Sequence, residues 1–205
     1  MRSRSSLIRA LVWSFATLLV VGTSTGLAQS GAANGEWRTY GGDLGSTRYA
    51  ALDQIDGNNF DQLEVQWRFK TRNLGPYPDF NYQTTPLMIG GVLYATAGSR
   101  RNVVSLDAET GELLWIYRLD EGERGTNAIR RMSGRGVAYW TDGQGDERIF
   151  VVTIGYQLIG LDATTGRPIP GFGRDGIVDL KQGNDQYIDP LTGEIGWNGA
   201  PVVAP

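Results

Sequence analysis

The chain repeats one order of apolar runs and turn residues. Its first copy, residues 85–117, contains TPLMIGGVLYATA, then VVSL, the turn DAETG and the run ELLWIY. The pair Gly90-Gly91 can adopt the positive φ angles of a two-residue turn, so residues 86–97 are predicted to form a β-hairpin. Together with VVSL and ELLWIY, the copy predicts four antiparallel strands.

The second copy, residues 136–172, contains GVAYW, RIFVVT, QLIGL, the turn DATTG and RPIPGF. Asp162 of its turn lies 55 positions after Asp107 of the first turn. A period of about this length is typical of propellers, solenoids and arrays. Four strands without a helical pattern between them favour a propeller blade. The sequence therefore predicts an all-β fold with about two four-stranded blades.

The turn D-A-x-T-G has a mechanical interpretation. Asp107 and Asp162 can accept hydrogen bonds from backbone amides across the turn, and Gly111 and Gly166 supply its left-handed residue. A calcium-binding loop would need several more acidic ligands at alternating positions, which DAETG lacks. We therefore predict structural turns here and no metal site.

A tryptophan distinguishes the two copies. Trp115 follows the first turn, and its large ring is expected to lie flat between neighbouring blades. Pro170 stands at the equivalent position of the second copy, and proline cannot donate to a β-ladder. The outer strand RPIPGF is therefore predicted to leave the sheet early.

Two further apolar segments have no hairpin partner nearby. Residues 63–69, LEVQWRF, alternate apolar and polar positions, which predicts a half-buried strand that closes a blade built from the other end of a ring. Residues 200–203, APVV, predict the opening strand of a third blade. A closed ring takes about four to eight blades. The fold class is thus a partial β-propeller.

Composition limits the chemistry. The chain has 205 residues, a formal net charge of −3, and neither cysteine nor histidine. These absences exclude thiolate nucleophiles, Ser-His-Asp triads and imidazole bases from this chain. The lack of a basic stripe argues against nucleic acid as a partner. Chemistry here must use carboxylates, hydroxyls, Arg, Lys or a cofactor.

The N-terminus has the pattern of an export signal. Three arginines precede the apolar run LVWSFATLLVVG, and the small residues of TSTGLA follow. This pattern predicts a signal peptide over residues 1–28 and a periplasmic product over residues 29–205. A retained membrane anchor is the alternative, although the run is short for a span of about twenty residues. Association with the membrane stays open.

Several motifs together resemble one family. YGGDLGSTRY, TTPLMIGG, RGVAYW and PIPGFG, within residues 37–205, resemble the N-terminal part of quinoprotein dehydrogenases that use pyrroloquinoline quinone (PQQ). The resemblance implies a propeller with PQQ and calcium at one end of its axis. It implies oxidation of a small alcohol or sugar, with electrons passed to a quinone or a cytochrome. A cofactor that performs the hydride chemistry suits a chain without histidine and cysteine.

The resemblance implies three cofactor-binding residues. Arg135 of RGVAYW stands where the family has an arginine that contacts the quinone, and a guanidinium suits a carboxylate. Gln83 of YQTTPL stands where alcohol-oxidising relatives often have glutamate, so that charge is missing here. Thr153, which ends RIFVVT, matches a threonine that reaches the cofactor. A surface arginine and an ordinary strand threonine are the alternatives for Arg135 and Thr153.

The chain also departs from the family pattern. Alcohol-oxidising relatives have two adjacent cysteines, which form a disulfide platform for the quinone, where this chain has residues 129–131, IRR. This places the chain nearer the sugar-oxidising or uncharacterised branches and leaves the substrate open. The calcium ligands and the catalytic aspartate of the family are expected beyond residue 205, so no catalytic or metal residue is assigned. The acidic residues within 179–189 are interpreted as a solvated loop.

Two other functions compete with the enzyme. One is a non-enzymatic quinoprotein-like propeller that serves as a scaffold for protein binding or outer-membrane assembly, and the other is a carbohydrate-binding propeller. RGVAYW and YGGDLGSTRY favour the enzyme, because a scaffold has no need of an arginine directed at the axis.

Overall fold

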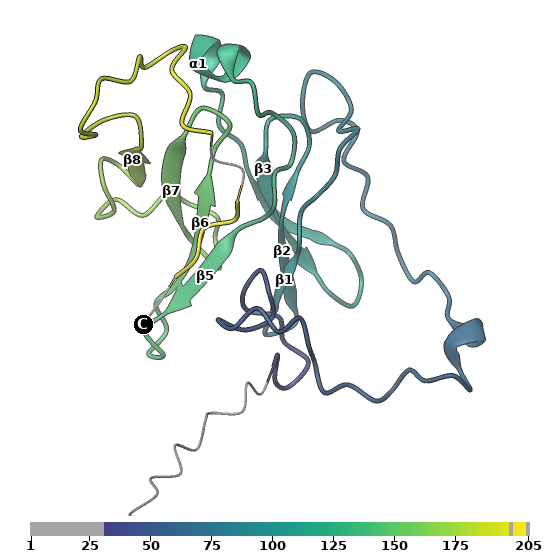
Figure 1. Ribbon diagram of the computed structural model, residues 1–205. Coiled ribbons are helices and arrows are strands. Elements are labelled where there is room, and N and C mark those ends of the chain that lie inside the picture. The colour runs from purple at the N-terminus through teal and green to yellow at the C-terminus, as the bar shows by residue number, and fades with distance from the viewer. Residues whose placement is uncertain (1–30, 197–198, 204–205) are drawn as a thin grey trace, which may run out of the picture.

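Two four-stranded antiparallel sheets make up the fold (Figure 1). The structure is a computed structural model that describes residues 31–196 and 199–203, so the expected signal peptide over residues 1–28 lies outside the described residues. The spatial order of the strands is β1-β2-β3-β4 in the first sheet and β5-β6-β7-β8 in the second. The predicted all-β, partial-propeller fold with two blades is confirmed. The strands are β1 (Leu87–Ile89), β2 (Val92–Ala97), β3 (Asn102–Asp107), β4 (Leu113–Tyr117), β5 (Ala138–Thr141), β6 (Glu147–Val152), β7 (Gln157–Asp162) and β8 (Ile177–Asp179).

Local turn chemistry explains both sheets. Gly90 and Gly91 have φ angles of 56° and 82° and join β1 to β2, as predicted. In the turn after β3, the Asp107 carboxylate accepts hydrogen bonds from the backbone N–H groups of Glu109 and Thr110 at 3.1 and 2.7 Å. In the turn after β7, the Asp162 carboxylate accepts hydrogen bonds from the backbone N–H and the hydroxyl of Thr165 at 2.7 and 2.6 Å. The mechanical interpretation of D-A-x-T-G therefore holds in both blades.

The outer strand of the second blade differs from the prediction. RPIPGF, residues 167–172, makes only an isolated bridge between Pro168 and Leu161, and β8 takes the outer position by pairing with residues 157–159 of β7. Pro168 and Pro170 have no N–H group, so the segment cannot continue a ladder. The early departure of this segment is confirmed, but the fourth strand lies further along the chain than predicted.

The two sheets face each other across one apolar core. Leu87 and Val103 from the first sheet and Ile149, Ile159 and Leu161 from the second are all fully buried in it. Each such side chain contributes about 1.5 to 3 kcal/mol when it leaves water. The blades are therefore held side by side by apolar contact.

Trp115 lies at the edge of this core, as predicted. Its indole covers Gly166, and its Nε1 donates a hydrogen bond to the carbonyl of Ala163 at 2.9 Å. Trp67 lies over Gly111 of the preceding turn in the same way and donates to the carbonyl of Ala108 at 3.1 Å. Each D-A-x-T-G turn is thus covered by a tryptophan from an upstream segment.

Two predicted strands are not present as strands in the described part of the chain. Residues 63–69 have no ladder partner there: Leu63 and Val65 are 53% and 64% exposed, and Trp67 and Phe69 pack on the outer face of the first sheet. Residues 200–203 likewise form no ladder. A strand needs a neighbour to satisfy its backbone groups, and none of the described segments supplies one.

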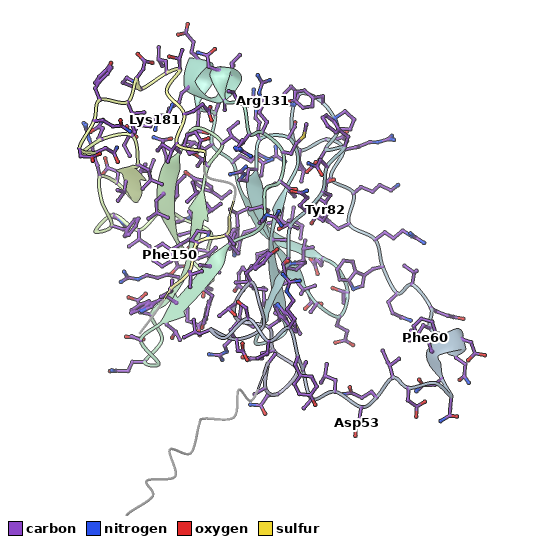
Figure 2. All side chains as sticks on the ribbon, viewed as in Figure 1. Asp53, Phe60, Tyr82, Arg131, Phe150 and Lys181 are labelled. Atoms are coloured by element: carbon purple, nitrogen blue, oxygen red, sulfur yellow. The ribbon has the colours of Figure 1, made fainter. Side chains whose placement is uncertain are left out.

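Two short helices were not predicted. A 3₁₀ turn, η1 (Phe60–Gln62), lies on a segment that projects away from both sheets, with Phe60 68% exposed (Figure 2). The helix α1 (Gly122–Asn127) connects the two blades. Within residues 31–196 and 199–203, no helix has both the length and the apolar character needed to cross a membrane.

Candidate functional site

The three residues assigned by resemblance come to one end of the blades. The segments that lead into β1 and β5 are joined there, because the N–H of Thr85 donates to the carbonyl of Arg135 at 3.1 Å. Gly136, with a φ of 120°, lies against the Thr85 carbonyl, where a Cβ atom would be crowded. Since β6 runs antiparallel to β5, the end of β6 and Thr153 lie at this same end.

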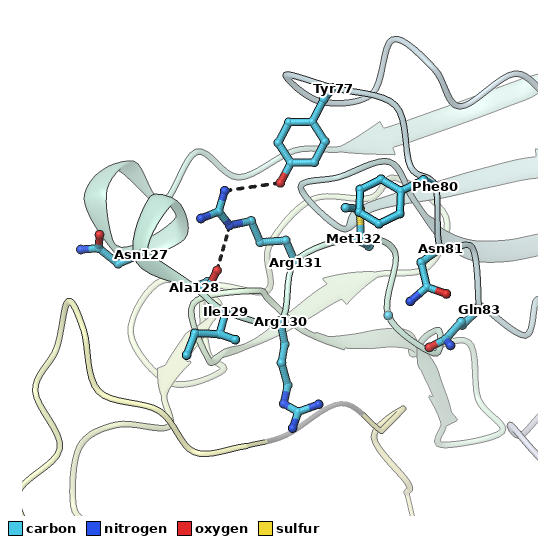
Figure 3. Close-up of a pocket in the computed structure, with 11 residues that line it drawn as sticks. Tyr77, Phe80, Asn81, Gln83, Asn127, Ala128, Ile129, Arg130, Arg131 and Met132 are labelled. Atoms are coloured by element: carbon cyan, nitrogen blue, oxygen red, sulfur yellow. Dashed lines mark hydrogen bonds between the residues drawn. The ribbon is translucent and has the colours of Figure 1, made fainter.

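An open pocket of about 510 Å³ lies at this end of the fold (Figure 3). The residues that line it include two cations, Arg130 and Arg131, together with Gln83 and apolar or aromatic side chains, and none of the residues lining it carries a carboxylate. Of the three assigned residues, only Gln83 lines this pocket; Arg135 and Thr153 do not.

Gln83 and Arg135 occupy accessible positions. The Gln83 N–H lies 3.5 Å from the Ser133 hydroxyl, which ties its backbone to the loop that precedes Arg135. The Arg135 side chain is exposed, and its Nη1 donates to the hydroxyl of Tyr40 at 3.2 Å. Tyr40 belongs to YGGDLGSTRY, so two of the motifs that carry the resemblance meet here.

Thr153 has a different environment. It is 5% exposed, its hydroxyl donates to a Glu121 carboxylate oxygen at 2.6 Å, and it accepts from the N–H of Gln157 at 3.0 Å. The second Glu121 oxygen accepts from the N–H of Gly155 at 2.9 Å, and burial raises the pKa of Glu121 above its ordinary value. The Thr153 hydroxyl therefore already forms two hydrogen bonds, at the point where α1 meets the β6–β7 hairpin.

The loop over residues 128–134 forms one wall of the pocket and is held by a buried arginine. Arg101 is 6% exposed and donates to the carbonyls of Arg130, Met132 and Val152 at 3.1, 3.2 and 3.2 Å. Burial lowers the pKa of Arg101 to about 10, which leaves it charged at neutral pH. Such charge-assisted hydrogen bonds to carbonyls fix the course of the loop.

Further contacts, within the loop and from other segments, stabilise the same loop. Arg131 donates to the Ala128 carbonyl at 2.8 Å and to the Tyr77 hydroxyl at 3.4 Å (Figure 3). From the C-terminal segment, a Glu194 oxygen accepts from the N–H of Ile129 at 3.3 Å. Sequence reasoning missed Arg101 and Glu194, since neither lies in a motif; the adjacent Arg100-Arg101 pair after Gly98 was the only signal for the first.

The sequence of residues 37–205 matches the family described as PQQ, glucose/ethanol/alcohol dehydrogenase, β-propeller domain. The chain belongs to this family. The dehydrogenase subunit of alcohol dehydrogenase (quinone) from Gluconobacter oxydans is 35% identical over 150 residues, which are 71% of this chain and 18% of that protein. The 1-butanol dehydrogenase (cytochrome c) from Thauera butanivorans is 33% identical over 149 residues, 72% of this chain and 20% of that protein.

A solved structure agrees with this family assignment. Quinohemoprotein alcohol dehydrogenase from Comamonas testosteroni superposes with a TM-score of 0.62 at 27% identity, covering 78% of this chain and 21% of that one. The chain thus spans about a fifth of the length of the quinoprotein dehydrogenases it matches.

The donors at this end of the blades suit PQQ, a flat quinone with carboxylate groups. Arg135 and Arg130 supply cations, Gln83 supplies an amide, and Phe80 and Tyr77 supply aromatic faces. Guanidinium groups match carboxylates in geometry and charge. For calcium, the described residues contain no group of three or more acidic side chains arranged to hold a metal ion.

Proposed function

We propose that the chain is the N-terminal part of an exported PQQ-dependent dehydrogenase that oxidises a CH–OH group of an alcohol or sugar. The observation that carries this proposal is the family match over residues 37–205. The position of Gln83 beside a pocket without carboxylates, at the end of the blades that also carries Arg135, supports it. Electrons would pass to a quinone or a cytochrome.

The chain's own residues would bind and orient the cofactor. PQQ, when bound, would supply the hydride acceptor. Arg135 would face a carboxylate of the quinone, with its guanidinium held by the Tyr40 hydroxyl, and Gln83 would donate through its neutral amide. Thr153 would act only after its hydroxyl leaves Glu121, so we assign it the smallest share of binding. The calcium ligands and the catalytic aspartate are expected beyond residue 205, so we assign neither role to a residue of this chain.

Export would place this chemistry in the periplasm. The arginines, apolar run and small residues of positions 1–28 support a signal peptide. If the segment is kept as an anchor, the same protein would be held at the membrane surface.

The test is PQQ-dependent turnover of the complete gene product. The purified protein is reconstituted with PQQ and Ca²⁺ and assayed with a dye acceptor against a panel of alcohols and sugars. Dye reduction that requires PQQ supports the proposal. A folded protein that neither binds PQQ nor reduces the dye contradicts it and favours the scaffold alternative.

A further inference from the structure

The segment that connects the two blades binds the turn between β6 and β7 through two charged side chains (Figure 1). The two Glu121 oxygens accept from the Thr153 hydroxyl at 2.6 Å and from the N–H of Gly155 at 2.9 Å. Arg124 of α1 donates to the carbonyls of Gly155 and Tyr156 at 2.5 and 3.2 Å. Glu121 and Arg124 therefore bind the N–H and the carbonyl of the same residue, Gly155. We call this set of contacts the connector clip.

The turn has the shape that the connector clip requires. A Cβ atom at Gly155 would lie 2.5 Å from a Glu121 oxygen and 2.8 Å from the Cγ atom of Arg124, so a side chain here would push the clip apart. The turn is also closed by a bond of its own, because the N–H of Thr153 donates to the Gln157 carbonyl at 2.9 Å. Opening of the clip would therefore separate the turn from the connector and leave the hairpin folded.

Glu121 carries the negative charge of the clip. Burial raises the pKa of Glu121 above its ordinary value, while its two hydrogen bonds and the charges of Arg124 and Arg101 act in the opposite direction. Both cations have other partners: Arg124 binds the two Asp179 oxygens, and Arg101 donates to three carbonyls. Within the described residues, neither cation forms an ion pair with Glu121. The effect of burial on the carboxyl therefore prevails.

An open cavity of about 280 Å³ lies beside Glu121. A water molecule takes up about 30 Å³ in the liquid, so this space admits several. An ionised Glu121 carboxylate can therefore turn away from the β6–β7 turn and become hydrated. The other titratable and charged groups around Glu121 are Tyr117, at the end of β4, and the cavity residues Tyr77, Arg100, Asp120 and Arg131.

We propose that the connector clip is controlled by a proton: it is closed when Glu121 is protonated and loosens when Glu121 is ionised. The protonated carboxyl can donate to the Thr153 oxygen across the 2.6 Å contact while its other oxygen still accepts from Gly155. The ionised carboxylate bears the cost of desolvation, which hydration in the cavity removes. Because Thr153 lies at the same end of the blades as Gln83 and Arg135, this proton sets how firmly that end is held.

The raised pKa of Glu121 fixes the direction of the response to pH. A carboxyl that binds its proton more tightly in the closed clip than in water makes acid favour the closed clip. The closed clip therefore becomes less stable as the pH rises from the ordinary glutamate pKa of about 4.3 through the value in the clip. Asp179 also binds Arg124, but its pKa is lowered, so it stays ionised over this range.

Hydrogen exchange of the complete gene product tests the clip. Protection factors of residues 153–157, corrected for the intrinsic effect of pH on exchange, are compared at about pH 4.5 and about pH 8, with the hairpin over residues 87–97 as reference. In the wild type, protection of the turn should fall about threefold or more at the higher pH, while the reference stays unchanged. Glu121→Gln, which is neutral throughout, should keep the higher protection at both pH values, and Glu121→Ala should lose it at both.

Glu123→Gln, at an exposed glutamate of α1, is the matched control and should follow the wild type. Equal protection of the wild-type turn at the two pH values overturns the proposal. A pH dependence that persists in Glu121→Gln also overturns it, because the proton would then belong to another group. If Glu121→Ala does not fold, the wild type and Glu121→Gln decide. None of these measurements needs PQQ, so their outcome is independent of the proposed function.

Discussion

The indole of Trp115 lies over Gly166 of the next blade, with its Nε1 donating to the Ala163 carbonyl at 2.9 Å. Gly166 has a φ of 68°, and a Cβ atom at this position would collide with the indole ring. The glycine is therefore required twice, for its backbone conformation and for the space it leaves. Trp67 and Gly111 form the same pair one blade earlier, so this tryptophan–glycine contact occurs at both D-A-x-T-G turns.

Two alanine substitutions test the contribution of the tryptophan–glycine contact to stability. Gly166→Ala should destabilise the protein by about 3 kcal/mol, because it combines a left-handed alanine with a clash against the ring. Gly143→Ala is the control: its φ is 72°, but nothing lies within 4 Å of the new Cβ, so it should cost about 1 kcal/mol. Calorimetric Tm values of the complete gene product report the difference. Equal losses in Tm would show that the ring contact does not matter.

Arg101 should be far more important for stability than its neighbour Arg100. Arg101→Met leaves two loop carbonyls and the Val152 carbonyl at the end of β6 without their donor and should cost about 3 kcal/mol. Arg100→Met removes only a surface ion pair with Asp120 and should cost about 0.5 kcal/mol or less.

Hydrogen exchange locates the effect of Arg101. Backbone amides of residues 128–134 should exchange faster in Arg101→Met, because the loop loses its anchor, and stay unchanged in Arg100→Met. Unchanged exchange in both variants would mean that other contacts hold the loop.

The ion pair between Arg124 and Asp179 predicts a pH dependence. Arg124 donates to both Asp179 oxygens, at 2.5 and 2.8 Å, and these bonds lower the pKa of Asp179. A carboxyl with a lowered pKa in the folded state stabilises the fold above its unfolded pKa, about 3.9, and this stability is lost as the pH falls through the folded value. Asp179→Asn should therefore lower Tm at pH 7, and the gap from wild type should shrink below about pH 4.

Tm measured from pH 3 to pH 7 checks this prediction. The exposed Asp185→Asn variant should follow the wild-type profile. A gap for Asp179→Asn that is constant across the range would refute the ion pair as its cause.

The sequence predicted most strands of the two blades because their cause is local. Two glycines fix the first hairpin, and the D-A-x-T-G turns fix the exits from β3 and β7. The closing strand over residues 63–69 stays a prediction: it has no ladder partner among the described residues, and alternation shows which face is apolar but not where the partner strand lies. β8 takes the place of RPIPGF because Pro168 and Pro170 cannot donate to a ladder. The early exit caused by Pro170 was predicted, but the position of the fourth strand was not.

The candidate site was less accessible to sequence reasoning. Motifs indicated Gln83, Arg135 and Thr153, and the structure brings them to one end of the blades. Arg101, Glu121 and Glu194 act through contacts 29 to 65 residues away in the chain, and no periodicity or turn signal reports such pairs. For the same reason, the hydrogen bond from the Thr153 hydroxyl to Glu121 could not be predicted from the sequence.

Residues 29–205 expressed alone should associate. In the described part of the chain, Trp67, Phe69 and Leu74 cover the outer face of the first sheet, and Leu63 and Val65 are more than half exposed. Exposed apolar faces and unpaired edges favour aggregation. Light scattering after gel filtration should show species larger than a monomer that bind a hydrophobic dye. Replacing Val65 by lysine should reduce this association; a monomer with a sharp melting transition would disprove the expectation.

The most direct measurement is a calorimetric titration of PQQ into the complete gene product and into its Arg135→Gln variant, both with Ca²⁺. Binding of one PQQ per protein is predicted, with affinity about tenfold weaker in the variant, because a guanidinium–carboxylate pair is lost. Arg174→Gln should bind PQQ as the wild type does. Absence of binding to the folded wild-type protein, or equal affinity in Arg135→Gln, would contradict the assignment of this end of the blades to the quinone.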